Sequence, residues 1–169
     1  MAAADGVLIL GIDPGTRVTG WGLVALVSGE PEGRESGVIA PKASWPLEQR
    51  LLHIFSELRD IITVHDPDQV AVEEPFVGES VRSAMAVGEA RTVAILAGTL
   101  AGLPISHHPP ARVKQTVAGN GRGDKEQVRE MLRLHLGLQS APDDLNASDA
   151  LAVALCHALE LRAAALTGR

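Results

Sequence analysis

The sequence predicts an α/β fold in which helices pack on both faces of a five-stranded mixed sheet. Three apolar runs joined by short turns, all within the first 39 residues, predict an antiparallel meander. Two later apolar runs are each separated from the strand before by a segment of helical spacing, which predicts strands parallel to the first. Strands followed by alternating helices and strands are typical of a mixed sheet covered on both sides.

The individual elements follow from periodicity and from Pro and Gly breakers. Strands are expected at 7–12, 20–27, about 35–39, 69–73 and 104–108. Helices are expected from 46 to 62, from about 80 to 101, at 111–118, from 124 to 137, and from about 146 to 166. No repeat or linker divides the chain, so we expect one domain over 1–169, with loose ends at 1–6 and about 165–169.

The composition limits the class of protein. Cys156 is the only cysteine, which excludes an intramolecular disulfide and fits a reducing, cytoplasmic compartment. The N-terminus lacks a signal-peptide pattern, and no apolar run is expected to span a bilayer. The net charge of −6 argues against a non-specific coat of nucleic acid, although it permits a local basic groove.

Acidic residues end two of the predicted core strands. Asp13 follows the first strand and precedes a Pro-Gly turn, and Glu73 ends the fourth strand. A carboxylate at the end of a buried strand is costly unless a positive charge compensates it. Asp13 suits a simple turn cap equally well. If the two strands are neighbours, however, both carboxylates lie at one end of the sheet, where α/β folds place their sites.

The last predicted helix supplies a third acid. Asn146 and Asp149 are three residues apart, so they share a helix face. Asn146 taken alone is best interpreted as an N-cap, whereas Asp149 precedes a tightly packed Ala/Leu run. Clustered oxygen ligands of high negative charge suit two Mg²⁺ or Mn²⁺ ions acting on a phosphate. A zinc site is not expected, because Cys156 has no neighbouring ligand pattern.

Basic residues and one aromatic residue are candidates for contact with nucleic acid. Arg112, Lys114, Arg122 and Lys125 follow the fifth strand, interspersed with acids. Such a mixture is usually a solvated helix face, but a Gly-rich loop can bring cations close to a phosphate. Phe76 follows the acid of the fourth strand and either packs into the core or stacks on an unpaired base.

Taken together, these motifs resemble the RuvC family of crossover junction endodeoxyribonucleases. The resemblance runs from about residue 7 to residue 161 and rests on five blocks in order: 11–22 (GIDPGTRVTGWG), 71–76 (AVEEPF), 88–91 (GEAR), 113–119 (VKQTVAG) and 148–154 (SDALAVA). An actin-like ATPase opens with a strand similar to the first block. That alternative needs two such domains and a second phosphate loop, for which this chain is too short.

The resemblance implies an RNase H-like fold and a homodimer that resolves four-way (Holliday) DNA junctions in recombination and repair. Each subunit would nick one of two opposed strands with Mg²⁺ or Mn²⁺, leaving 5′-phosphate and 3′-hydroxyl ends. The implied metal carboxylates are Asp13, Glu73 and Asp149, with Phe76 as the stacking residue. Two lysines, Lys114 and Lys125, match basic positions near the phosphate, and the implied partners are the RuvA and RuvB branch-migration proteins.

One departure from the family pattern concerns Asn146, where the family commonly has a further Asp ligand. As a candidate metal ligand, Asn146 offers only a neutral amide oxygen, so the site loses one negative charge. We therefore expect an enzyme that works better with Mn²⁺ than with Mg²⁺, unless Asp143 or Asp144 substitutes. The alternative is a catalytically weak or inactive scaffold that only binds junctions.

Overall fold

A single mixed sheet forms the centre of the computed structural model, which describes residues 6–75, 81–119 and 125–167. The strands are β1 (Leu8–Asp13), β2 (Thr19–Val27), β3 (Glu30–Ile39), β4 (Gln69–Glu73) and β5 (Ile105–His108). They lie in the order β3-β2-β1-β4-β5. The first three are antiparallel, and β4 and β5 run parallel to β1. The predicted α/β class and strand directions are therefore confirmed.

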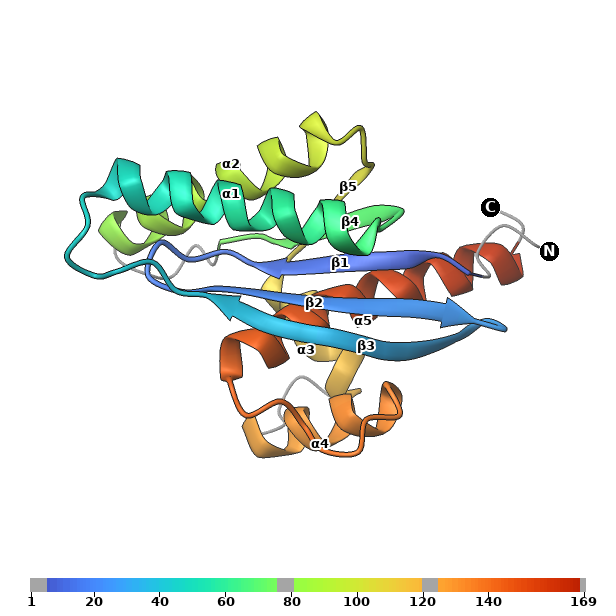
Figure 1. The fold of residues 1–169 in the computed structure, drawn as a ribbon. Helices are drawn as coiled ribbons and strands as arrows, with labels where there is room; N and C mark the ends of the chain where they lie inside the picture. Colours follow the sequence, from blue (N-terminus) through green and yellow to red (C-terminus); the bar gives the residue numbers. More distant parts are fainter. Residues whose placement is uncertain (1–5, 76–80, 120–124, 168–169) are drawn as a thin grey trace.

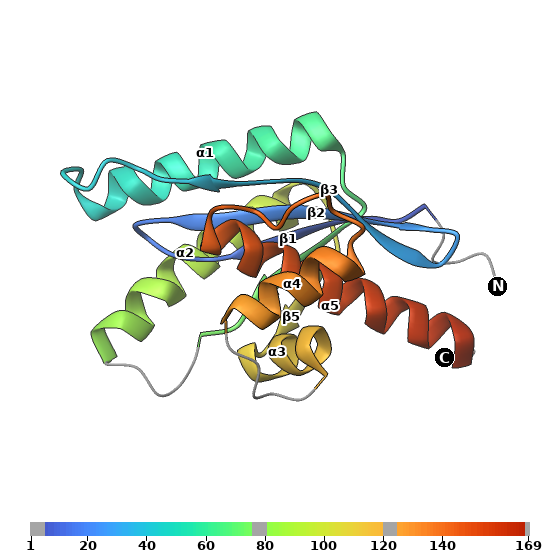
Figure 2. The same cartoon turned by 90° about the horizontal axis from the view of Figure 1, so that it is seen from below.

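Helices cover both faces of this sheet (Figure 1). The helices are α1 (Leu47–His65), α2 (Val81–Leu100), α3 (Pro110–Ala118), α4 (Lys125–His135) and α5 (Leu145–Thr167). One apolar core joins the sheet to α1 and α2, and a second joins it to α3, α4 and α5. Figure 2 shows α5 running beneath the strands with α3 and α4 beside it. The central position of α5 makes it the element that connects the sheet to the smaller helices.

The third strand is longer than predicted. It begins at Glu30 and not near residue 35, and Val27 pairs with Glu30 across the turn. The turn residues Ser28 and Gly29 have φ values of 53° and 80°. Two consecutive residues with positive φ form the tight turn whose twist suits a hairpin. Residues 30–34, which were expected to precede the strand, therefore form its first half at the edge of the sheet.

Glycines allow α5 to lie unusually close to the sheet. A Cβ atom on Gly11 would lie 2.7 Å from the backbone nitrogen of Ala154. A Cβ atom on Gly22 would lie 2.7 Å from Cγ of Leu151, and one on Gly20 would collide with the carbonyl of Asn146. Because real Cβ atoms do not approach other atoms so closely, any larger residue would push the helix away.

By length and composition alone, α5 is apolar enough to cross a membrane, although no run of the sequence was expected to do so. Its residues 147, 148, 150–156 and 158 are buried against the strands and α3. A helix that is apolar on all sides is found either in a membrane or in a protein core. The packing against the sheet explains the composition of α5, which is the core helix of this fold.

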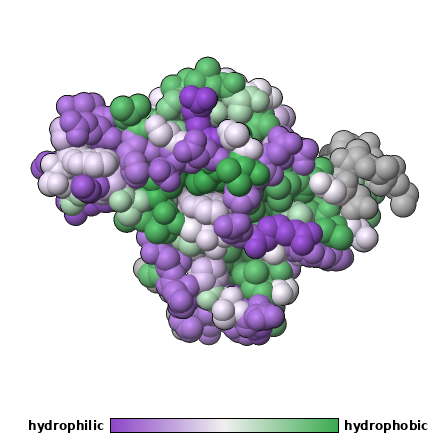
Figure 3. Space-filling model, viewed as in Figure 1, coloured by the Kyte–Doolittle hydropathy of each residue, from purple (hydrophilic) through white to green (hydrophobic). Residues whose placement is uncertain are grey.

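The outer face of α2 is apolar and exposed. Ala90, Ala94 and Ala97 face the core, while Leu96 and Leu100 are 48% and 67% exposed. In Figure 3 hydrophobic residues gather at the top of the molecule, where α2 ends. A helix as apolar as α2 is either fully internal or faces a second subunit. The exposed leucines show that it is not fully internal within one chain.

Candidate active site

Two carboxylates lie side by side where β1 and β4 end. The strands are parallel, with Ile12 paired to Val72, so Asp13 and Glu73 occupy the next position on neighbouring strands. Strand alternation turns both side chains away from α1 and α2 and toward α5. The cross-strand partner of Asp13 on β2 is Gly20, which leaves room for α5 to approach.

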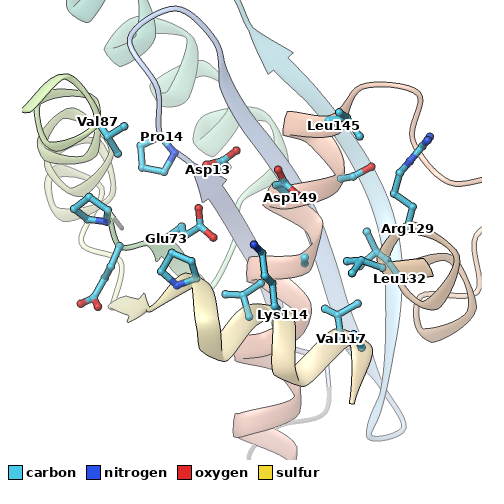
Figure 4. A pocket seen from close by; sticks show the side chains of 18 residues that line it. Asp13, Pro14, Glu73, Val87, Lys114, Val117, Arg129, Leu132, Leu145 and Asp149 are labelled. Carbon is cyan, nitrogen blue, oxygen red and sulfur yellow. The ribbon is translucent and has the colours of Figure 1, made fainter. Parts of the chain in front are cut away.

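The third carboxylate comes from the first turns of α5. Figure 4 shows the side chains of Asp13, Glu73 and Asp149 directed toward one another from β1, β4 and α5. The negative charge of Asp149 contributes, after burial, to raising the pKa of both Asp13 and Glu73. Three acids that are far apart in the chain therefore converge in one place, as the sequence predicted.

The N-cap prediction for Asn146 is wrong. The helix begins at Leu145, and the Asp144 carboxylate accepts hydrogen bonds from the backbone N–H of Asn146 at 2.8 Å and from its side-chain amide at 3.0 Å. Asp144 is therefore the cap, as short acids at this position often are. These hydrogen bonds lower the pKa of Asp144. The amide of Asn146 is turned toward Asp144, and Asn146 does not line the cavity beside the carboxylates.

Burial and mutual repulsion raise the pKa values of Asp13 and Glu73, so these carboxyl groups ionise less readily. Burial, with repulsion from Asp149, raises the pKa of Asp13 from 3.8 to about 7. Burial, with repulsion from Asp13 and Asp149, raises the pKa of Glu73 from 4.5 to about 8, although Lys114 opposes the increase. Without cations, Asp13 and Glu73 therefore share a proton in the hydrogen bond between their side chains.

The carboxylates open into a cavity of about 450 Å³. Its walls come from the ends of β1 and β4, from α2, α3 and α4, and from the start of α5. The ion pairs of the described residues include neither Asp13 nor Glu73. Within the described part of the chain, Asp13 and Glu73 therefore have no permanent Arg or Lys counter-ion, which suits a cation or a substrate that brings cations with it.

The basic candidates have different surroundings. Lys114 lines the cavity from α3, and Figure 4 shows its amine directed toward the carboxylates. Arg112, in contrast, pairs with Glu160 at 3.2 Å and does not line the cavity. Of these two, only Lys114 can contact a phosphate held at the acids without first giving up an ion pair.

Arg129 lines the cavity and was not among the predicted site residues. Its guanidinium donates to the carbonyl of Pro142 at 2.6 Å and points away from the acids in Figure 4. The hydroxyl of Ser148, next to Asp149 in the chain, donates to the same carbonyl at 3.4 Å. Arg129 therefore anchors the loop that precedes α5. Its spacing of four residues from Lys125 was a sequence signal for a shared helix face.

Three of the predicted site residues have side chains outside the described part of the chain. Phe76 and Arg122 lie outside the described residues. Lys125 begins α4, but its side chain is not among those described.

The residues present fit hard divalent cations. Three carboxylates supply oxygen ligands only, which suit Mg²⁺ or Mn²⁺ better than zinc. Burial, together with like charges held close by the fold, raises the pKa values of Asp13 and Glu73, and a bound cation would offset that cost. The donor set and its electrostatics therefore agree with the metals expected from the sequence.

Comparisons with known proteins agree on one family. The model of the family described as crossover junction endodeoxyribonuclease RuvC matches residues 9–157. A protein of that name from Chloroflexus aurantiacus is 48% identical over 149 residues, which cover 88% of this chain and 91% of the relative. Its counterpart from Rubrobacter xylanophilus is 42% identical over 161 residues, covering 95% and 90%.

Solved structures give the same result. The structure described as T. thermophilus RuvC in complex with a Holliday junction substrate superposes with a TM-score of 0.86 at 34% identity. The match covers 93% of this chain and 96% of that one. The predicted RNase H-like fold is therefore confirmed. By sequence, by strand order and by structure, this chain belongs to the RuvC family of crossover junction endodeoxyribonucleases.

Proposed function

We propose that this chain hydrolyses a phosphodiester bond in one of two opposed strands of a four-way DNA junction, using the carboxylates Asp13, Glu73 and Asp149, while a second copy cuts the other strand. The observation that carries this proposal is their convergence in one cavity, with pKa values of about 7 and 8 for Asp13 and Glu73. A protein that only bound junctions would gain nothing from holding like charges together. The scaffold alternative is therefore not favoured.

Asp13, Glu73 and Asp149 would hold two Mg²⁺ or Mn²⁺ ions. Such ions activate a water molecule and stabilise the leaving oxygen of a phosphate. The protein positions the scissile phosphate, and Lys114 adds positive charge at the wall of the cavity. The cleaved strands would carry 5′-phosphate and 3′-hydroxyl ends. Lys125, Arg122 and Arg112 would contact the backbone of the DNA, and Phe76 would stack on a base at the junction.

The active form would be a homodimer, because two opposed strands must be cut together. The exposed apolar face of α2, with Val81, Met85, Leu96 and Leu100 between 48% and 77% exposed, supports a contact between two copies there. From the family resemblance, we also propose that the protein is cytoplasmic and works with the RuvA and RuvB branch-migration proteins.

Cleavage of a synthetic four-way junction tests this function. We expect Asp13→Asn to bind the junction with unchanged affinity. We expect its cleavage rate with Mn²⁺ to fall by more than the roughly 100-fold that follows loss of a residue supporting a metal ligand. Asp60→Asn, which makes the same change on the exposed surface of α1, should cleave at the wild-type rate. If the wild type binds but does not cut with any divalent ion, the chain is a scaffold.

A further inference from the structure

A second group of potential metal ligands lies beside α5, outside the carboxylate cavity. His108 ends β5, and Cys156 and Glu160 lie one turn apart on α5. One ligand atom from each of these residues lies within 4.8 Å of the others. None of the three lines the carboxylate cavity. Cys156 lies about two turns from Asp149 along the same helix.

The spacing of these atoms is close to that of a tetrahedral zinc site. The Sγ atom of Cys156 lies 3.7 Å from Nδ1 of His108, and Oε2 of Glu160 lies 3.8 Å from the same nitrogen. Ordinary zinc–ligand bond lengths place neighbouring ligand atoms about 3.4–3.6 Å apart. Two of the three pairs therefore need to contract by only a few tenths of an ångström to hold an ion.

A chain of hydrogen bonds directs the lone pair of His108 into the cluster. Nε2 of His157 donates to Oε1 of Gln69 at 2.7 Å, so Nδ1 of His157 is left as an acceptor. It accepts from Nε2 of His108 at 3.3 Å. Nδ1 of His108 consequently carries no hydrogen and faces Cys156 and Glu160. Metal-binding histidines commonly donate their other ring N–H to a fixed partner in this way.

The two carboxylate oxygens of Glu160 also have different partners. Oε1 accepts a hydrogen bond from Nε of Arg112 at 3.2 Å, while Oε2 faces His108. Glu160 is 39% exposed, whereas His108 is 3% exposed and Cys156 is fully buried. Glu160 thus forms the opening of the cluster, and its orientation is already held by a partner that would not compete for the metal.

We propose that His108, Cys156 and Glu160 form a binding site for a thiophilic divalent ion, Zn²⁺, separate from the carboxylate cavity. Cys156 binds as the thiolate and its proton passes to solvent, so one thiolate and one carboxylate neutralise the ion. Three protein ligands leave the fourth tetrahedral position to water. Because His108 pairs with Glu73 in the sheet, the ion would also tie β5 to α5 next to the strand that carries a catalytic acid.

Cobalt titration of the full-length protein tests this proposal. Excess Mg²⁺ is present to occupy the carboxylate cavity. Cys156 is the only cysteine, so a near-ultraviolet thiolate-to-cobalt charge-transfer band can come from this site alone. We expect one equivalent of Co²⁺ to produce the band and one equivalent of Zn²⁺ to remove it. We also expect Asp13→Asn to leave the band unchanged.

Two variants separate metal binding from folding. Cys156→Ser should lose the band. Glu160→Gln, at the more exposed position, should keep the fold by circular dichroism and bind Co²⁺ at least about 10-fold more weakly. Absence of the band in the wild type would overturn the proposal, and so would Co²⁺ affinity unchanged by Glu160→Gln. In either case the cluster is only a hydrogen-bonded part of the core. Neither outcome bears on junction cleavage.

Discussion

Two clusters of ionisable side chains lie along the same helix, and their chemistry is opposite. Near its beginning, α5 presents Asp149 to Asp13 and Glu73, so three acids repel one another. Two turns later it presents Cys156 to His108, where the groups are linked by hydrogen bonds. The first cluster carries uncompensated negative charge unless cations bind, whereas the polar groups of the second cluster already have hydrogen-bond partners.

This contrast shows how one fold can hold a site for hard cations and a separate site for a thiophilic cation. Oxygen ligands with excess negative charge select Mg²⁺ or Mn²⁺, which must stay exchangeable to meet a DNA phosphate. Sulfur and imidazole ligands in a buried network select zinc and hold it firmly. Four experiments test whether the two clusters differ in this way.

The largest effect is expected for Asp149→Asn, which removes charge from the first cluster only. We expect the cleavage rate to fall by more than about 100-fold, because one ligand of the catalytic ions is lost. The cobalt band assigned to Cys156 should persist with unchanged affinity. The independence of the clusters is refuted if this substitution abolishes the band.

The second effect is a pH dependence of stability specific to the acidic cluster. The unfolded chain has lost the protons of Asp13 and Glu73 above about pH 5, whereas the metal-free folded chain keeps them up to pKa values of about 7 and 8. The free energy of unfolding therefore decreases as the pH rises through this window. Between pH 6.5 and 8 we expect a loss of about 2 kcal/mol, or roughly 5 °C in Tm.

Glu73→Gln provides the control for this measurement. It removes one of the two titrating groups, so its Tm should fall less than that of the wild type over the same range. Burial lowers the pKa of His108 and His157 in the folded chain, whereas in the unfolded chain both histidines lose their protons near pH 6.5 and just above it. They therefore add a small increase in stability over this range, which is common to the wild type and Glu73→Gln. Addition of Mn²⁺ should remove the decrease. Equal slopes for wild type and Glu73→Gln would contradict the assigned pKa values.

A third, smaller effect concerns the hydrogen-bond chain of the second cluster. Gln69→Leu removes the acceptor that holds the tautomer of His157, and through it that of His108. We expect Co²⁺ affinity to decrease about 10-fold, as is typical when a partner of a metal ligand is lost. The rate of junction cleavage with saturating Mg²⁺ should stay within twofold. A loss of cleavage without a loss of Co²⁺ affinity would contradict this role.

The smallest effect is expected for Asn146→Asp, which restores a negative charge near Asp13. Asn146 lies against Gly20, the cross-strand partner of Asp13. We expect the rate with Mg²⁺ to rise about threefold relative to the rate with Mn²⁺, because Mg²⁺ depends more on the charge of its ligands. Wild-type rates that are already equal in the two metals would remove the basis of this prediction.

Much of the first cluster was predictable from the sequence, because its residues sit at marked positions. Asp13 and Glu73 end apolar strands that a helix makes parallel neighbours, so their proximity follows from topology. Asp149 was a candidate because it precedes a tightly packed Ala/Leu run, although its spacing also fitted the start of a helix, and the family resemblance supported the assignment. The cap was misassigned because Asp144 and Asn146 are both good cap residues, and only the structure shows which one accepts the hydrogen bonds.

The second cluster was invisible in the sequence. His108 and Cys156 are 48 residues apart, and neither belongs to a local ligand pattern. They meet only because α3 leads the chain away from β5 and α5 returns beneath the sheet. The start of β3 was missed for a simpler reason. Ser28 adopts a positive φ that propensity does not predict, and this tightens the hairpin.

The close approach of α5 to the sheet affects which substitutions the enzyme can accept during evolution. At Gly11 and Gly20 the helix rests directly on main-chain atoms, with no side chain between them to act as an adjustable spacer. The core elsewhere can exchange one aliphatic residue for another and shift slightly, but at this contact no side chain can adjust to absorb a shift. A substitution that displaced α5 would therefore also displace Asp149 from the strand that carries Asp13.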